Sequence, residues 1–211
     1  MKNDSLALKV YTEIQKQILT IQILPDTRLK EYFWAKKLGV SRMAVREALT
    51  RLLGERLVSL GPKGGYFVTS LTHEDLFQLR ELREILELGA LRLAKDKISK
   101  EQINRLEKIC QDFTTMVEQG YYSGANEADL KFHQTLMECS GNAKLIQTYN
   151  NSHIPLFHQQ LIKNNGSGYD FDLTNKEHRA ILKALKEKNI KLAEKNMRLH
   201  FARGAILMGL P

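Results

Sequence analysis

Asp129 and His133 stand four residues apart in the stretch ADLKFHQTL, whose other residues have the apolar spacing of a buried helix. Residues four apart lie one above the other on a helix, so the two side chains point the same way. Polar groups on a largely apolar face cost roughly 2 kcal/mol or more each unless they find partners. The pair therefore bonds to itself or to water, or it belongs to a larger polar site.

Two more histidines are expected on inward helical faces. His178 is followed at +3, +4 and +7 by apolar residues, and His200 is preceded by Met197 and Ala193. Asn189, at the predicted turn between the two helices, is 11 residues from each histidine. Residues equidistant from the turn of an antiparallel hairpin lie level, and 11 residues is close to three helical turns. The two imidazoles are therefore expected side by side.

One carboxylate and three imidazoles form a ligand set that zinc, nickel, manganese and iron accept. The predicted cofactor is a divalent transition metal, with zinc first, held by Asp129, His133, His178 and His200. A chance coincidence of four inward polar residues is the alternative. With an open coordination position for water, the same set could also serve a metal-dependent enzyme. Glu177, the nearest acid in sequence, lies about 100 degrees around the helix from His178, so no positioned acid or base is evident.

Arg83 is a further candidate because it shares a helical stripe with Leu79, Leu86 and Ala90. A guanidinium on such a stripe needs an anion. An i,i+4 ion pair with Glu87 would supply one, and a bound anionic ligand would supply another.

The elements that must position these residues are helices. From residue 71 onward the apolar spacing predicts helices throughout, without a strand pattern. The predicted helices cover about 72–95, 100–119, 123–140, 143–163, 174–187 and 190–209. Thr72 and Asp75 are spaced as a capping box, and Pro155 should kink the fourth helix. Six helices with short connections indicate an antiparallel bundle, with His153 and His158 beside the kink as possible pocket neighbours.

The distribution of charged residues divides the chain into a basic first third and a nearly neutral remainder. Residues 1–70 contain 12 Lys and Arg against 6 Asp and Glu, whereas residues 71–211 contain 20 against 18. Most of the formal net charge of +8 therefore lies in the first third. We interpret residues 1–70 as a module that binds a polyanion, attached to a regulatory or catalytic body of residues 71–211.

The basic third has the element order of a winged helix-turn-helix. Apolar spacing predicts helices over about 6–21, 31–38 and 42–54, followed by strands over 57–60 and 66–69. Ser41 is placed as the N-cap of the third helix, where Arg42 and Arg46 share the outward face. That helix fits the major groove, and both arginines could reach bases or phosphates. A merely solvated arginine face is the alternative, which the basic surplus and the Gly-rich wing with Lys63 disfavour.

Other features exclude several classes of protein. The two cysteines, Cys110 and Cys139, have no CxxC partner, which argues against a disulfide framework or a thiolate zinc site. The N-terminal residues do not resemble a signal peptide, and no stretch has the roughly 18 apolar residues of a membrane span. We therefore expect a cytoplasmic protein with no membrane partner.

The stretch PDTRLKEYFWAKKLGVSRMAVREAL resembles the DNA-binding domain of GntR-family transcription regulators, whose pattern includes L-G-V-S-R-T-P-V-R-E-A-L. The resemblance implies that Arg42 and Arg46 contact DNA and that Ser41 and the Gly64-Gly65 wing approach phosphate. Met43 replaces the usual Thr in the first turn of the recognition helix, so it is expected to affect the sequence preference.

The second part resembles the FCD effector domain of the FadR-type subfamily. DLKFH, SGN, EHRAILKAL and MRLH match the pattern D-x-x-F-H, S-G-N, H-x-x-I-x-x-A-I and M-x-x-H. The match implies metal ligands at Asp129, His133, His178 and His200, and a carboxylate effector at Arg83. A helical domain of six helices resembles the shorter, VanR-like branch of this subfamily.

The sequence therefore predicts a mainly α protein, with a winged helix-turn-helix at 1–70 and a helical effector domain at 71–211. The predicted function is that of a homodimeric regulator that binds a pseudo-palindromic operator in double-stranded DNA. A small organic acid at the metal site would control its operator affinity. A metal-dependent enzyme using the same Asp/His site is the alternative.

Overall fold

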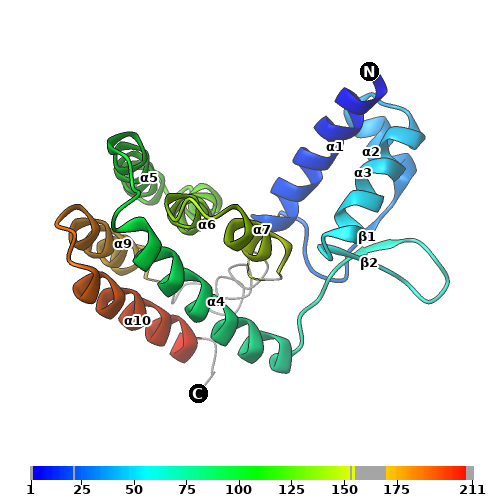
Figure 1. Ribbon diagram of the computed structural model, residues 1–211. Coiled ribbons are helices and arrows are strands. Elements are labelled where there is room, and N and C mark those ends of the chain that lie inside the picture. The colour runs from blue at the N-terminus through cyan, green and yellow to red at the C-terminus, as the bar shows by residue number, and fades with distance from the viewer. Residues whose placement is uncertain (1, 21, 153, 155–169, 208–211) are drawn as a thin grey trace.

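The computed structural model describes residues 2–20, 22–152, 154 and 170–207. Figure 1 shows two groups of elements, one at each side of the view. The N-terminal group contains α1 (Lys2–Leu19), β1 (Arg28–Leu29), α2 (Glu31–Leu38), α3 (Arg42–Gly54), β2 (Val58–Leu60) and β3 (Tyr66–Val68). In the three-stranded sheet, β3 lies between β1 and β2 and is antiparallel to both. This order confirms the predicted winged helix-turn-helix.

Strand β1 was missing from the sequence-based prediction, which assigned only a turn to residues 24–27. The strand has two residues, with Arg28 paired to Phe67 and Leu29 to Tyr66. Two residues are too few to show an alternating pattern, so only the tertiary pairing reveals the strand. This pairing satisfies the edge of β3 that faces away from β2 and so supports the strands from which the wing extends.

The core of the N-terminal group packs α1 and α3 against the sheet. Gly39 ends α2 with a left-handed backbone (φ 65°), which allows the sharp turn into α3. The apolar residues that fill this core are Val10, Ile14, Ile18, Leu29, Trp34, Val45, Leu49, Leu52, Leu57 and Val68. Because the apolar face of α3 packs into this core, the polar face of the helix points to solvent.

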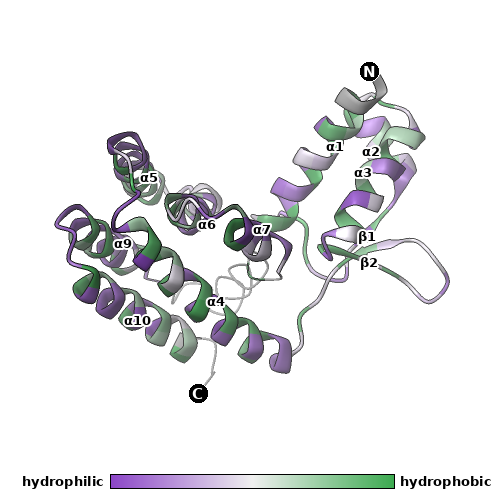
Figure 2. Ribbon diagram, in the orientation of Figure 1, coloured by the Kyte–Doolittle hydropathy of each residue, from purple (hydrophilic) through white to green (hydrophobic). Residues whose placement is uncertain are grey.

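The second group is a helical bundle, as predicted. Its described helices are α4 (His73–Ala94), α5 (Lys100–Glu118), α6 (Tyr122–Cys139), α7 (Ala143–Asn151), α9 (Phe171–Lys186) and α10 (Ile190–Leu207). The predicted capping box opens α4, since the Asp75 amide donates to Thr72 Oγ1 at 3.1 Å and the Thr72 amide to Asp75 Oδ2 at 2.9 Å. In Figure 2 these helices carry both hydrophobic and hydrophilic ribbon, which is the pattern of amphipathic helices around a core.

The bundle core lies between α4, α5, α6, α9 and α10, and a second cluster packs α4 against α6 and α7. Its two cysteines, Cys110 and Cys139, are free and buried, and burial raises the pKa of each thiol to about 11. Leu71 packs against both the N-terminal core and the second bundle cluster. The boundary at residue 70 stays a prediction.

The predicted helix over 143–163 is wrong in its extent, because α7 ends at Asn151. Ser152 has an extended backbone, and its hydroxyl donates to Tyr149 O at 2.7 Å and accepts from the Ile154 amide at 3.2 Å. These local bonds compete with helix continuation ahead of Pro155. His153, His158 and Pro155 lie outside the described residues, and so does the choice between six and seven helices. No described helix is long and apolar enough to span a membrane.

Candidate DNA interface and metal centre

Helix α3 presents its polar face to solvent and its apolar face to the N-terminal core. Ser41 has an extended backbone and accepts a hydrogen bond from the Ala44 amide at 3.2 Å, so it is the N-cap predicted from sequence. The side chains of Arg42 and Arg46 are largely exposed one turn apart. Met43, beside them in the first turn, is also exposed.

Glu31 of α2 holds the arginine pair. Its carboxylate accepts from Arg46 Nε at 2.9 Å and from Arg46 Nη2 at 3.1 Å, and it lies 3.6 Å from Arg42 Nη2. The hydrogen bond from Arg46 lowers the pKa of the Glu31 carboxyl. Sequence reasoning identified Glu31 only as the start of a helix, because the clamp forms across the turn between α2 and α3. The two arginine side chains are thus partly ordered by one carboxylate.

The wing lies between β2 and β3. Lys63 is exposed, and Gly64 and Gly65 have left-handed backbones (φ 78° and 90°) that a side chain would strain. The Gly64 amide donates to Gly61 O at 2.8 Å, which closes the turn. Lys63, Gly64 and Gly65 therefore belong to the loop between β2 and β3. Figure 1 shows this loop projecting from the N-terminal group that also contains α3.

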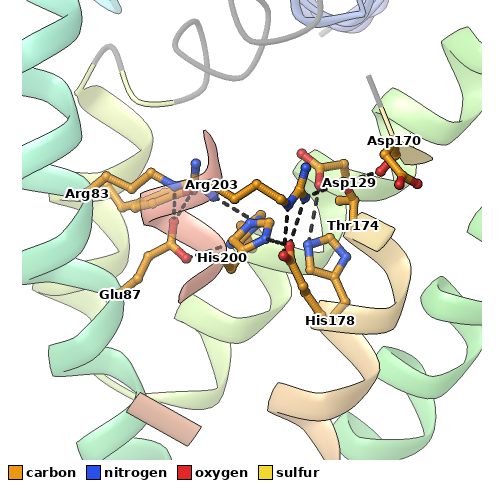
Figure 3. A network of polar contacts seen from close by, with 11 residues as sticks. Arg83, Glu87, Asp129, Asp170, Thr174, His178, His200 and Arg203 are labelled. Atoms are coloured by element: carbon orange, nitrogen blue, oxygen red, sulfur yellow. Dashed lines mark hydrogen bonds and ion pairs between the residues drawn. The ribbon is translucent and has the colours of Figure 1, made fainter. Parts of the chain in front are cut away.

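The second site is a buried cluster of histidines from three helices of the bundle. His133 of α6, His178 of α9 and His200 of α10 each place one ring nitrogen so that all three lie within 4.8 Å of one another. The α9–α10 hairpin sets His178 and His200 level, with ring centroids 5.0 Å apart. Asp129 of α6 is also buried, and its Oδ1 lies 3.4 Å from His178 Nε2. Figure 3 shows Asp129, His178 and His200 converging between the helices.

Two glutamates orient two of the histidines, the buried Glu87 and the partly buried Glu177. Glu87 Oε2 lies 2.6 Å from His133 Nδ1, and Glu177 Oε2 lies 2.7 Å from His200 Nδ1. A carboxylate at Nδ1 favours the tautomer with its proton there, which leaves Nε2 with a lone pair. Glu87 and Glu177 therefore turn the Nε2 atoms of their histidines into acceptors or ligands.

An arginine accompanies each glutamate (Figure 3). Arg83 Nε donates to Glu87 Oε1 at 2.8 Å, and Arg203 Nε donates to Glu177 Oε1 at 2.8 Å. Burial alone would raise the pKa of the Glu177 carboxyl, but hydrogen bonds from His200 and Arg203 lower it to about 2. Both glutamates thus belong to Arg–Glu–His sets. Sequence reasoning missed these sets because they join α4 to α6 and α9 to α10.

His178 differs from the other two histidines. Phe132 stacks on its ring at 4.1 Å, and burial lowers its pKa to about 3, so the imidazole is neutral. Within the described part of the chain, its Nε2 has no hydrogen-bond partner. A neutral, buried imidazole without a hydrogen bond at Nε2 suits a metal ligand.

The donor set fits a metal ion. Imidazole nitrogens at about 2.0–2.1 Å from one tetrahedral zinc ion lie about 3.4 Å apart, so nitrogens within 4.8 Å of one another would move together by roughly 1 Å to bind it. His133, His178 and His200 could supply nitrogens and Asp129 an oxygen, which a borderline transition metal accepts. The carboxylates at Nδ1 of His133 and His200 supply the usual outer partners of metal-bound imidazole.

The chain matches two protein families. Residues 6–68 match the gntR family of bacterial regulatory proteins, and residues 78–203 match the FCD domain. It is a GntR-family regulator with an FCD domain. The predicted family and fold are confirmed, and the chain is a DNA-binding transcription regulator rather than an enzyme.

Relatives of this GntR-family regulator agree with that assignment. It is 29% identical over 199 residues to the HTH-type transcriptional regulator YdhC of Bacillus subtilis, covering 92% of this chain and 87% of YdhC. Its fold matches that of E. coli McbR/YncC with a TM-score of 0.84 and 22% identity, covering 97% of both chains. The metal-free FCD domain of TM0439 matches with a TM-score of 0.54 and 17% identity, covering 66% of this chain and 96% of that domain.

Arg83 lies at the histidine cluster of this GntR-family regulator, where the sequence left two alternatives open. The ion pair with Glu87 is present, and Arg83 Nη2 also lies 2.8 Å from His133 Nε2. The guanidinium is buried; burial opposes its charge, but Glu87 outweighs this and raises the pKa of Arg83. One arginine therefore touches both Glu87 and the nitrogen of His133 that would face a metal.

Proposed function

We propose that this regulator holds a divalent transition metal, zinc first, through Asp129, His133, His178 and His200, and that a small carboxylate bound there controls its affinity for DNA. The observation that carries the proposal is the convergence of three buried imidazoles, two of them with a glutamate at Nδ1. A bound metal would supply a Lewis-acidic centre that attracts an anionic ligand. Arg83 would add a second cation for the same carboxylate.

A route from this site to the DNA-binding group is supported by α6. Asp129 and His133 lie on its buried face, whereas Glu127 of the same helix forms an ion pair with Lys16 of α1 at 3.1 Å. A cleft of about 570 Å³ between the two groups is lined by residues of both, including Gln15 and Arg51 on one side and Lys131 on the other. A shift of α6 on effector binding would therefore reach α1 directly.

On DNA, we assign the contacts to α3 and the wing. The proposed contact residues are Ser41, Arg42, Met43, Arg46, Lys63, Gly64 and Gly65. A single such group offers few contacts, so the protein would act as a homodimer on a pseudo-palindromic operator. Effector binding would change the placement of the two DNA-binding groups and so their joint affinity, with a coupling of about 1–3 kcal/mol.

Ser41 allows capping and DNA contact to be separated. Ser41→Ala should lower the stability of the N-terminal group by about 1 kcal/mol because the N-cap is lost. Ser41→Asp should keep that stability, since aspartate also caps helices, but should weaken DNA binding because its charge faces phosphate. Urea unfolding and fluorescence anisotropy with duplex DNA measure the two effects. Unchanged DNA binding in Ser41→Asp would remove Ser41 from the interface.

Glu87 and Glu177 provide a test of the metal site that leaves its ligands in place. Glu87→Gln and Glu177→Gln should each weaken metal affinity by about 10–100-fold, because the amide can no longer fix the histidine tautomer as a carboxylate does. Competition with a chromophoric chelator measures the affinity, and ¹⁵N chemical shifts of the ring nitrogens report the tautomer. Glu138→Gln, at an exposed ion pair with Arg105, is the control. Native affinity in both Glu87→Gln and Glu177→Gln would contradict the assigned role.

The proposal as a whole is tested by metal analysis followed by a thermal-shift screen. Purified protein should contain about one metal ion per chain, and small carboxylic acids should raise the unfolding temperature of the loaded protein only. A purely structural metal is the second possibility. Chelation would then lower stability, while the response of DNA binding to the acid would persist.

A further inference from the structure

Arg28 of β1 lies against the wing, the loop between β2 and β3. It is paired with Phe67 of β3, and antiparallel partners place their side chains on one face of the sheet. The guanidinium carbon of Arg28 lies 5.9 Å from the centre of the Phe67 ring, which is within the range of a cation–π contact. The Arg28 side chain is therefore held at the base of the wing.

Two glycines of the wing make room for this contact. A Cβ at Gly61 would lie 2.5 Å from the Phe67 ring, so the ring packs where only glycine fits. A Cβ at Gly65 would lie 3.3 Å from Nε and from Nη2 of Arg28, so the guanidinium packs against bare backbone. Gly65 is among the residues that we assign to the DNA interface. Arg28 therefore lies at the same surface as that interface.

The charge of Arg28 is not neutralised by a neighbour. Arg28 is exposed, and no carboxylate among the described residues forms an ion pair with it. By contrast, Glu31 holds Arg46 of α3. Contacts with a ring face and with glycine backbone leave the N–H donors of a guanidinium free for an anion. Arg28 can therefore bind a polyanion without first giving up an ion pair.

With α3 in the major groove, the wing would meet the adjoining minor groove. The major groove of B-DNA admits one α-helix, and Figure 1 shows the wing extending beyond the strands of the N-terminal group. A narrow minor groove in A·T-rich DNA has an enhanced negative potential that attracts arginine. Guanine adds a 2-amino donor there, which opposes a guanidinium, whereas A·T pairs present only acceptors.

From this geometry we infer that Arg28 enters the minor groove beside the α3 site and gives the regulator a preference for A·T pairs in the operator flanks. Phe67 positions the guanidinium, and Gly65 keeps its other side clear of side chains. This role rests on the wing contact of the proposed function. It extends that contact with a residue outside the wing and with the base pairs that the residue selects.

Modified bases separate the two grooves in the flanks of a duplex selected from a random-sequence pool. Inosine·cytosine has the major-groove edge of G·C without the 2-amino group, and diaminopurine·thymine has the major-groove edge of A·T with that group added. Duplexes with A·T or inosine·cytosine flanks should bind alike. Duplexes with G·C or diaminopurine·thymine flanks should bind about tenfold more weakly. Anisotropy titrations measure the four affinities.

Variants of Arg28 assign the preference to this side chain. Arg28→Ala should bind all four duplexes with about the affinity that the wild-type protein has for G·C flanks. Arg28→Lys should keep the salt slope but lose most of the preference, because its ammonium group is more strongly hydrated than guanidinium. Arg51→Ala is the control and should keep the preference. Arg51 is an exposed arginine of α3 that pairs with Glu55 and lines the cleft between the two groups.

Three results would overturn this role of Arg28. They are an A·T preference that survives in Arg28→Ala, an inosine·cytosine duplex that binds like G·C, and an equal loss of affinity for all four duplexes in Arg28→Ala. The second would indicate reading in the major groove, and the third a phosphate contact. The wing contact is judged separately, since it fails if Lys63→Ala leaves affinity and salt slope unchanged on every duplex.

Discussion

Replacing Arg42 and Arg46 together with alanine is expected to lower operator affinity by at least about 1,000-fold. The two exposed guanidiniums lie on the outward face of α3 and share Glu31, so they can turn together toward DNA. Each arginine contact is worth about 1–3 kcal/mol, and a dimer has four of them. Anisotropy titrations with a duplex selected from a random-sequence pool measure the loss.

The salt dependence of the same titration identifies the kind of contact that was lost. If the arginines bind phosphates, the slope of log affinity against log salt should flatten by about one for each contact removed. If they bind bases, sequence discrimination should fall while the slope stays. Arg105→Ala is the control, since Arg105 is half-exposed and also pairs with a glutamate, but lies on α5. Unchanged affinity and slope in the double variant would remove α3 from the interface.

Removing His133 is expected to have the second large effect. His133 is fully buried and stands between Glu87 and Arg83, with its Nε2 in the histidine cluster. His133→Ala deletes a ligand itself, so metal affinity should fall by more than the 10–100-fold of an outer-partner change. The rise in unfolding temperature on metal addition should disappear with it.

One control variant and one comparison of metal-free proteins make this result specific. His73→Ala removes an exposed histidine at the start of α4 and should leave metal binding unchanged. His133→Ala also leaves Glu87 and Arg83 without their histidine, so the metal-free variant should be less stable than the metal-free parent. Stoichiometric metal binding with native affinity in His133→Ala would exclude His133 as a ligand.

The sequence predicted the residues that follow helical spacing and missed those defined by contacts between helices. Asp129, His133, His178 and His200 were found because their inward positions follow from periodicity and from the symmetry of one hairpin. Glu87 is 46 residues from His133 in sequence, and Glu177 is 23 residues from His200. Only the packing of α4 on α6 and of α9 on α10 brings these carboxylates to the imidazoles.

The role of Glu177 could not be predicted from its position on its own helix. Glu177 lies about 100 degrees around the helix from His178, and on that ground the sequence offers it no role as an acid or base at the site. The packed hairpin directs it instead to His200 on the neighbouring helix. The early end of α7 has a similar origin, since the hydroxyl bonds of Ser152 to local backbone outweigh the apolar spacing that predicted a longer helix.

Control of DNA affinity by a metal-bound carboxylate can be measured in one titration. Operator binding by zinc-loaded protein should change by about 5–150-fold when a small carboxylic acid found in the thermal-shift screen is added. The same acid should have no effect on His133→Ala or on chelated protein. An operator affinity that is the same with and without every acid tested, or a response that survives removal of the metal, would contradict metal-dependent control by a carboxylate.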